Sequence, residues 1–151
     1  MKVAILMGSA NDAEKMAPAR ETLEAFGVEH EVWAMSAHRT PGAVREFVAG
    51  ARGNGFGVLI AGAGMAAHLA GACAAHTTLP VIGVPLSGSA LNGVDALYAT
   101  VQMPPGMPVG TVAIDGAANA ALLAVQILAV TDADLAAKLD DHRSSWQPQQ
   151  L

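Results

Sequence analysis

Short apolar runs alternate along the chain with longer stretches that are amphipathic or rich in alanine. The apolar runs occupy positions 3–7, 31–34, 57–61, 81–84 and 109–114. Short runs rich in Val, Ile and Leu predict buried strands, and most of the stretches between them predict helices. Strands that alternate with helices form right-handed βαβ units, which build a parallel sheet covered on both faces. The pattern therefore predicts a doubly wound, flavodoxin-like α/β domain with three layers and a mainly parallel five-stranded sheet.

Turn-forming residues set the expected ends of the helices. Gly27 is a stop signal for the first helix, and Pro41 suits the first turn of the second. The expected helices end near Phe26, Arg52, His76, Val130 and Ser145. The chain, 1–151, is expected to form a single domain, with 132–151 as a C-terminal helix and a loose tail.

The composition supports one domain with a substantial core and excludes disorder. Of 151 residues, 52% are hydrophobic and 14% are charged, so apolar burial can outweigh the loss of chain entropy. The net charge of −5 gives no attraction to phosphate polymers or anionic lipid, which disfavours nucleic-acid and membrane-surface functions. Charged residues make up about a quarter of a typical soluble protein. This chain covers its surface more thinly, so we expect apolar subunit interfaces.

Cysteine usage and the distribution of apolar residues indicate the cytoplasm. The single cysteine, Cys73, cannot form an internal disulfide, and the first apolar run is too short for the core of a signal peptide. The stretch 57–75 is dominated by Ala and Gly and is interrupted by His68, so we interpret it as a buried element rather than a membrane span. We therefore expect a cytoplasmic protein without a membrane partner.

Unusual residues follow the first three predicted strands. In a parallel sheet the carboxyl ends of the strands share one edge, and open α/β folds bind ligands at that edge. In the strand order 2-1-3-4-5, the turns at Ser9 and Gly64 flank one crevice, and His38 and Arg39 overhang it from the second strand. We expect the functional site there.

The first turn combines a tight exit from the strand with Ser9 and Asp12. Both side chains can cap the next helix, whose free N–H groups attract an anion. Ordinary capping is the plain alternative. Because a carboxylate repels a phosphate, Asp12 suits the hydroxyl groups of a sugar, which favours a nucleotide over a bare anion.

The second turn places His38 beside Arg39. A guanidinium offers a two-pronged contact to phosphate or carboxylate, and an imidazole can move a proton near neutral pH. The two side chains could instead be a solvated histidine and a surface ion pair. Spacing alone leaves both interpretations open.

The third turn, 62–67, matches the dinucleotide-binding pattern G-x-G-x-x-A. That fold needs an acid about 20 residues later for the ribose, and no Asp or Glu occurs between Glu46 and Asp95. What remains is a turn of small residues, including Gly64, whose backbone can approach a ligand and donate N–H groups to a carboxylate. The five histidines lack the paired spacing of metal ligands, so no metal is predicted.

Five ordered motifs carry a resemblance to a known enzyme family. They read Gly8-Ser9-x-x-Asp12, Ser36-Ala37-His38-Arg39-Thr40-Pro41, Ala61-Gly62-Ala63-Gly64-x-Ala66-Ala67-His68-Leu69, Leu79-Pro80-Val81-Ile82-Gly83-Val84-Pro85 and Val101-Gln102-Met103-Pro104. On these motifs the chain resembles the class I N5-carboxyaminoimidazole ribonucleotide mutases, the PurE family of purine biosynthesis.

The resemblance implies an isomerase that moves a carboxyl group from the exocyclic nitrogen of an aminoimidazole ribonucleotide to ring carbon C4, without metal or cofactor. It implies that His38 is the catalytic proton carrier. The residues that align with the substrate pocket of the family are Ser9, Asp12, Ser36, Arg39, Gly64, His68 and Leu69. The resemblance also implies a homo-octamer and a separate ATP-dependent synthetase that makes the carbamate substrate.

The chain departs from the family pattern at three places. Met65 stands where glycine is common, Ala70 stands where proline is frequent, and the stretch around 115–118 is shortened. Two alternatives to the mutase stay open. One is direct carboxylation by carbon dioxide in the same pocket, which is the reaction of class II relatives. The other is a non-catalytic nucleotide-binding protein on the same fold.

Overall fold

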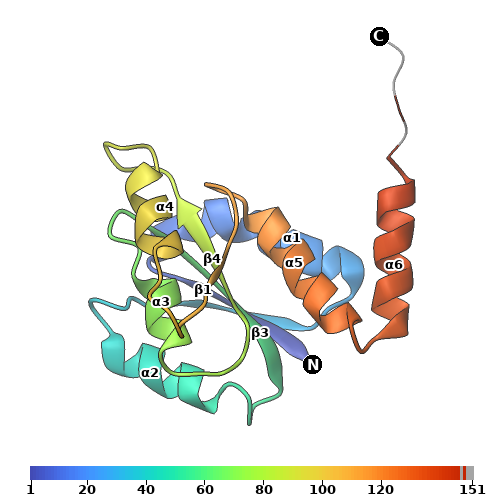
Figure 1. Ribbon diagram of the computed structural model, residues 1–151, viewed down its shortest axis with the longest axis horizontal. Coiled ribbons are helices and arrows are strands. Elements are labelled where there is room, and N and C mark those ends of the chain that lie inside the picture. Colours follow the sequence, from blue (N-terminus) through green and yellow to red (C-terminus); the bar gives the residue numbers. More distant parts are fainter. Residues whose placement is uncertain (147, 149–151) are drawn as a thin grey trace.

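A five-stranded sheet forms the middle layer of the computed structural model, which describes residues 1–146 and 148. The strands are β1 (Lys2–Met7), β2 (His30–Ala34), β3 (Phe56–Gly64), β4 (Val81–Leu86) and β5 (Gly110–Thr111). Their order in the sheet is β2-β1-β3-β4-β5, and every neighbouring pair is parallel (Figure 1). The predicted fold class and strand order are therefore confirmed.

Helices cover both faces of the sheet. They are the short 3₁₀ helix η1 (Ala10–Asp12) and the α-helices α1 (Ala13–Phe26), α2 (Pro41–Gly50), α3 (Leu69–Ala74), α4 (Val94–Val101), α5 (Ala117–Ala129) and α6 (Ala133–Ser144). Figure 1 shows α1 and α5 on one side of the sheet and α2, α3 and α4 on the other. The helices and the sheet together make the three predicted layers.

Alternate side chains of the strands face the two helical layers. In β1, Val3 and Ile5 are fully buried in the core under α1 and α5, while Ala4 and Leu6 are fully buried against α2 and α3. A strand buried on both sides has no polar face, which explains the unbroken apolar runs in the sequence. Both cores hold the sheet, so the loops that leave its carboxyl edge start from fixed points.

The structure differs from the sequence prediction in four elements, one of which is β4, which continues to Leu86 and not only to Val84. Strand β3 continues through Gly64, so Gly62 and Gly64 lie in the sheet, where a side chain at Gly62 would overlap the Met16 thioether. Strand β5 is limited to Gly110–Thr111. Helix α4 is missing from the predicted elements, although Val94, Tyr98 and Val101 recur at helical spacing within its short sequence.

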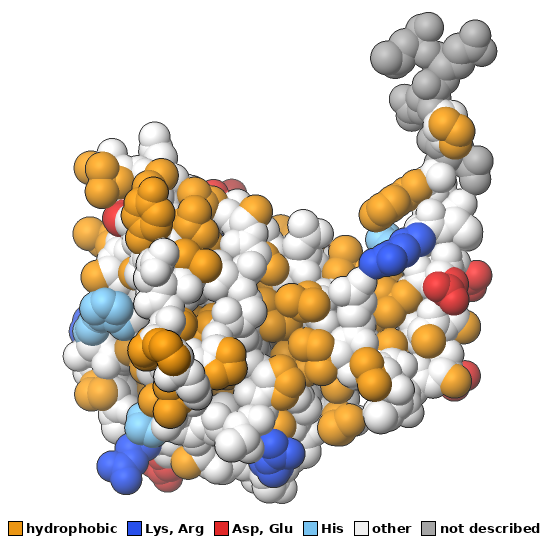
Figure 2. Space-filling view, in the orientation of Figure 1, with side chains coloured by type: hydrophobic (Ala, Val, Ile, Leu, Met, Phe, Trp, Pro, Cys, Tyr) orange, Lys and Arg blue, Asp and Glu red, His pale blue; other side chains and the backbone are white. Residues whose placement is uncertain are grey.

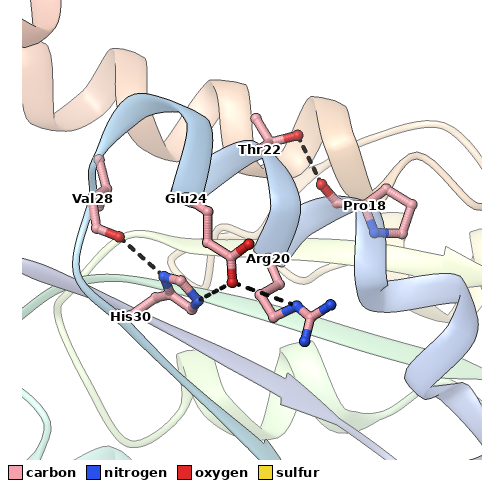
Figure 3. A network of polar contacts seen from close by, with 6 residues as sticks. All are labelled: Pro18, Arg20, Thr22, Glu24, Val28 and His30. Carbon is pink, nitrogen blue, oxygen red and sulfur yellow. Dashed lines mark hydrogen bonds and ion pairs between the residues drawn. The ribbon is translucent and has the colours of Figure 1, made fainter.

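A small polar network fixes the connection from α1 to β2 at the amino edge of the sheet (Figure 3). Gly27 ends α1 in the left-handed conformation, with φ 69°, as predicted for a helix stop. His30 Nδ1 lies 3.0 Å from Val28 O, and its Nε2 lies 4.0 Å from the Glu24 carboxylate, which also lies 3.7 Å from Arg20 Nε. His30 is therefore a structural histidine that joins the helix to the strand.

The last helix, α6, is tied to the body near the end of α1. Asp132 caps it by accepting the N–H groups of Asp134 and Leu135, and Lys138 Nζ donates to Phe26 O at 2.8 Å. Of the predicted tail, residues 147 and 149–151 lie outside the described part of the chain. Among the described residues, no helix is long and apolar enough to cross a bilayer.

Candidate active site

A cavity of about 710 Å³ opens at the carboxyl edge of the sheet, where the sequence predicts the site. The loops after β1, β2, β3 and β4 supply its walls. The lining residues are Gly8, Ser9, Asn11, Asp12, Ser36, Ala37, His38, Arg39, Ala63, Gly64, Met65, Ala66, His68, Leu69, Ser87 and Gly88. Every residue that the sequence assigns to the site lines this one cavity.

The turn after β1 brings Ser9 and Asp12 to one wall of the cavity. Ser9 Oγ accepts a hydrogen bond from the N–H of Asn11 at 3.2 Å, and the Asp12 N–H donates to Ser9 O at 3.1 Å. Asp12 stands at the start of α1 but makes no side-chain capping bond there. The capping interpretation therefore holds for Ser9 and not for Asp12.

The surroundings of Asp12 suit a ligand that donates a hydrogen bond. Burial raises the pKa of Asp12, and the hydrogen bond with Ser9 and the charges of Lys15 and Arg39 oppose this only in part. A partly desolvated carboxylate gains from a new donor. A sugar hydroxyl in the cavity would supply one.

The loop after β2 carries His38 and Arg39 and is closed by its own hydrogen bonds. Ser36 Oγ accepts from the Arg39 N–H at 3.2 Å, and Thr40 Oγ1 accepts from the Ser36 N–H at 2.9 Å. The Arg39 guanidinium reaches across to the first turn, where Nη2 donates to Gly8 O at 3.2 Å. A guanidinium has five N–H donors, so this bond fixes its position and leaves donors for an anion.

His38 meets His68 in the cavity. His38 Nε2 lies 2.7 Å from His68 Nδ1, and the rings are inclined at 80°. At this distance one ring nitrogen donates a hydrogen bond and the other accepts it, and the tautomers of the two rings set its direction. His68 lies just before α3, so the contact joins the loop after β2 to the turn after β3. The sequence brings both histidines to the site but does not predict that they touch.

Small residues at the end of β3 open the floor of the cavity. A side chain at Gly64 would lie 3.3 Å from the carbonyl oxygen of Leu86, so glycine lets β3 and β4 stay close. After Gly64 the chain turns at Met65, whose φ is 56°. The prediction of a turn at 62–64 is therefore wrong, because these residues continue the strand and the turn begins after them. Leu69, at the start of α3, is buried beside the cavity.

A network of Lys15, Ser87 and Asp115 holds the loop after β4 at the rim of the cavity. Lys15 Nζ donates to the carbonyl oxygen and to the hydroxyl of Ser87, each at 2.7 Å. Asp115 accepts the N–H of Ser87 at 2.9 Å and its hydroxyl at 2.5 Å. These residues are absent from the predicted site because the predicted fourth strand ends at Val84, whereas β4 continues to Leu86. The rule that parallel strands end at one edge was the signal that could have found Ser87.

The carboxylate of Asp115 is stabilised in its ionised form. Burial acts to raise its pKa, but the hydrogen bonds from Ser87 and the charge of Lys15 outweigh burial, so the pKa lies below its ordinary value. Asp115 also adopts a left-handed φ of 57°, in the stretch where the resemblance shows a shortening. Charged partners therefore fix the loop after β4 at neutral pH.

Other candidate groups lie away from the cavity. Cys73 is fully buried, and burial raises the pKa of its thiol to about 12, so it is an unreactive core residue. Within residues 1–146 and 148, no three His, Cys, Asp or Glu side chains are grouped to hold a metal ion. The polar side chains that line the cavity include imidazole, guanidinium, hydroxyl and carboxylate groups.

Comparisons with known proteins find relatives over nearly the whole chain. The AIR carboxylase family model matches residues 2–149. A Brucella melitensis protein named N5-carboxyaminoimidazole ribonucleotide mutase is 54% identical over 145 residues, which cover 95% of this chain and 90% of the relative. An Escherichia coli protein of the same name is 54% identical over 146 residues, covering 95% and 86%. A crystal structure of PurE from Treponema denticola matches with a TM-score of 0.84 at 27% identity, covering 95% and 89%.

Proposed function

The chain belongs to the AIR carboxylase family, and from that membership and the cavity we propose that it is an N5-carboxyaminoimidazole ribonucleotide mutase. Such an enzyme is an isomerase of purine biosynthesis that moves a carboxyl group from the exocyclic nitrogen to ring carbon C4. The observation that carries the proposal is the meeting of His38 and His68 in the same cavity as Asp12 and Arg39. A proton carrier and the anchors for a ribonucleotide are then within one site.

Ser9, Asp12 and Arg39 hold the ribose phosphate in this proposal. Arg39 supplies the charged fork for the phosphate, and Asp12 accepts a sugar hydroxyl. Ser36 and Gly64 shape the cavity between these anchors and the ring. Binding energy from the phosphate and sugar fixes the ring against the histidines, where the reaction takes place.

His38 carries the proton that the rearrangement requires. The carbamate N–C bond breaks as the exocyclic nitrogen takes a proton from His38, which gives carbon dioxide and the amine. Ring carbon C4, which is enamine-like, then attacks carbon dioxide and forms the new C–C bond. His38 takes up the proton that C4 loses, so it returns to its starting state and no co-reactant is consumed.

His68 positions the His38 ring. The 2.7 Å contact between the ring nitrogens restricts the orientation of both side chains. In this proposal the contact holds the His38 imidazole ready to exchange its proton first with the departing nitrogen and then with C4.

Containment of carbon dioxide is the second requirement. Carbon dioxide must react with C4 before it escapes from the cavity. Holding it near the ring makes this step effectively unimolecular, so it does not depend on a slow encounter in solution. The apolar side chains of Ala63, Ala66 and Leu69 line the cavity beside His68. They provide an apolar wall that suits neutral carbon dioxide and keeps water from the intermediate.

The two alternatives are separated by supplying the substrate in two ways. The protein is incubated with aminoimidazole ribonucleotide and bicarbonate, with and without an ATP-dependent synthetase that makes the carbamate. A mutase forms the C4-carboxylated product efficiently only with the synthetase. Equal turnover without the synthetase would identify the class II reaction. Ribonucleotide binding without turnover in either mixture would identify a non-catalytic binding protein.

A homo-octamer is the assembly that this proposal includes. Leu91, Val94, Tyr98 and Val101 are 61%, 43%, 61% and 45% exposed. Their spacing of three or four residues puts them on one face of α4 and the turn before it, and Figure 2 shows hydrophobic side chains gathered over this part of the surface. An exposed apolar face supports a subunit interface. Size-exclusion chromatography with light scattering should give an octameric mass, and a monomer at micromolar concentration would contradict it.

The proposal also includes a cytoplasmic location for the enzyme and a separate ATP-dependent synthetase that supplies its substrate. The lone Cys73 is consistent with a reducing compartment, where structural disulfides are rare. The carbamate substrate is unstable, so the ATP-dependent synthetase that makes it must act in the same compartment. A search for the synthetase activity in the same extract tests that partner.

A further inference from the structure

Met65 has an unfavourable backbone conformation for its residue type. In the described part of the chain, three residues other than glycine have positive φ: Met65 at 56°, Asn92 at 50° and Asp115 at 57°. Asn and Asp tolerate the left-handed region because their short polar side chains bond locally, whereas a long apolar side chain does not. Glycine is the residue that suits position 65, so the methionine needs an explanation.

The position of Met65 within the cavity gives that explanation. It lies between Gly64 and Ala66 in the turn after β3, and all three line the cavity with His68. Its carbonyl oxygen accepts the N–H of Ala67 at 2.9 Å, which holds the turn in place. The side chain is 66% exposed although it is apolar, so packing does not hold it in one rotamer at the wall of the cavity.

We propose that the Met65 side chain is a cover over the carbon dioxide compartment and determines how much of the released gas is recaptured by C4. This inference rests on the proposed mutase function. A neutral apolar gas is retained by apolar walls, and on this side Ala63 and Ala66 are too small to close the compartment. Methionine has a flexible, polarisable side chain that adapts to an irregular gap. Carbon dioxide that passes the cover is hydrated to bicarbonate, and aminoimidazole ribonucleotide is left behind as a side product.

The test measures partition between rearrangement and escape. The carbamate substrate is given to the parent enzyme and to Met65→Gly, and the C4-carboxylated product is compared with aminoimidazole ribonucleotide after subtraction of the rate without enzyme. We expect the escaping share to rise roughly fourfold in Met65→Gly, the effect of losing contact with about one methylene group. Added ¹³C-bicarbonate should enter the product more readily by a similar factor. A residue that only supports the fold would change the turnover rate without changing this partition.

Two further variants complete the experiment. Asn92→Gly changes a second exposed left-handed residue, one that does not line the cavity, and it should keep the parent partition. Met65→Leu restores apolar bulk and should return the partition toward that of the parent. Glycine suits the conformation at position 65, so the Met65→Gly variant should melt no lower than the parent, and its melting curve checks this.

The possible outcomes separate the two proposals. If the parent rearranges the carbamate and Met65→Gly shows the same partition and the same label entry, the cover is refuted and the mutase stands. If the parent forms no C4-carboxylated product, the mutase itself fails. A rise in escape that Asn92→Gly reproduces would also refute the cover, because the effect would then follow from backbone conformation alone.

Discussion

The two ends of the sheet carry cavities of comparable size but different construction. The cavity at the carboxyl edge measures about 710 Å³, and the cavity at the amino edge, beside α2, α3 and the start of β4, measures about 940 Å³. The larger one also has cationic and titratable side chains, among them Arg45, Arg52 and His76. Volume and charge together would favour the amino edge, whereas the family and the chemistry favour the carboxyl edge.

The direction of the helices explains the difference. In a parallel α/β fold the helices run against the strands, so their amino ends lie at the carboxyl edge of the sheet. Helices α1 and α2 begin there, and helix amino ends favour anions. Helices α2 and α3 end at the amino edge, where cations interact favourably with the last carbonyl groups. Arg52 follows α2, and its Nη2 donates to Thr78 Oγ1 at 3.0 Å. A ligand-binding cation is therefore identified by its backbone surroundings rather than by its charge.

The largest expected effect comes from exchanging a histidine at each edge. His38→Asn removes the proposed proton carrier, so kcat should fall by about 10²- to 10⁴-fold, while ribonucleotide binding should be kept. His76→Asn, at the amino edge, should leave kcat unchanged. Steady-state kinetics and a binding isotherm measure both. Loss of activity in both variants, or in neither, would remove the contrast between the two edges.

Arginine exchange tests the same contrast at the level of binding. Arg39→Lys keeps the charge but loses the two-pronged geometry, so KM should rise about tenfold. Arg45→Lys at the amino edge serves as the matched control and should leave KM unchanged. An unchanged KM in Arg39→Lys would contradict the proposal that this guanidinium binds the phosphate of the substrate.

Lysine exchange tests whether the loop after β4 belongs to the site. Lys15 and Lys138 each donate to a backbone carbonyl, Lys15 to Ser87 at 2.7 Å and Lys138 to Phe26 at 2.8 Å. Lys15→Met removes both hydrogen bonds to Ser87. It should raise KM at least fivefold, which corresponds to about 1 kcal/mol, because Ser87 lines the cavity. Lys138→Met should lower stability in denaturant by a similar free energy and leave KM unchanged. If the two variants behave alike, the Lys15 network is only structural.

The difference between these lysines also shows what could be predicted from the sequence. His38, Arg39 and Asp12 could be assigned because each follows a strand whose carboxyl end the apolar pattern locates. Lys15 could not, since it lies on a helix and its role depends on how α1 faces the loop after β4. The same holds for the contact between His38 and His68, which joins two loops 30 positions apart.

The sequence predicts whether a segment is a strand or a helix where burial determines its apolar pattern. It does not predict the residues at which these elements end. The apolar run in β1 has one interpretation because both of its faces are covered. Strand β3 continues through Gly62 and Gly64. Glycine is common in turns, so the sequence predicts that the strand ends before these two residues. There the pairing of Gly62 and Gly64 with β4 continues the strand, and Met16 leaves no room for a side chain at Gly62. Tertiary pairing therefore overrules the local turn propensity of glycine.

The smallest expected effect is at Arg52, and it is the sharpest test of the comparison. Arg52→Ala removes an exposed hydrogen bond to Thr78, and such surface changes alter stability by no more than about 0.5 kcal/mol. Because the surrounding helix ends disfavour an anion, kcat/KM should also stay at the parent value, with the oligomeric mass measured alongside. A fall in kcat/KM at unchanged mass would mean that the amino-edge cavity takes part in substrate binding or turnover. The direction of the helices would then not determine which edge of the sheet carries the active site.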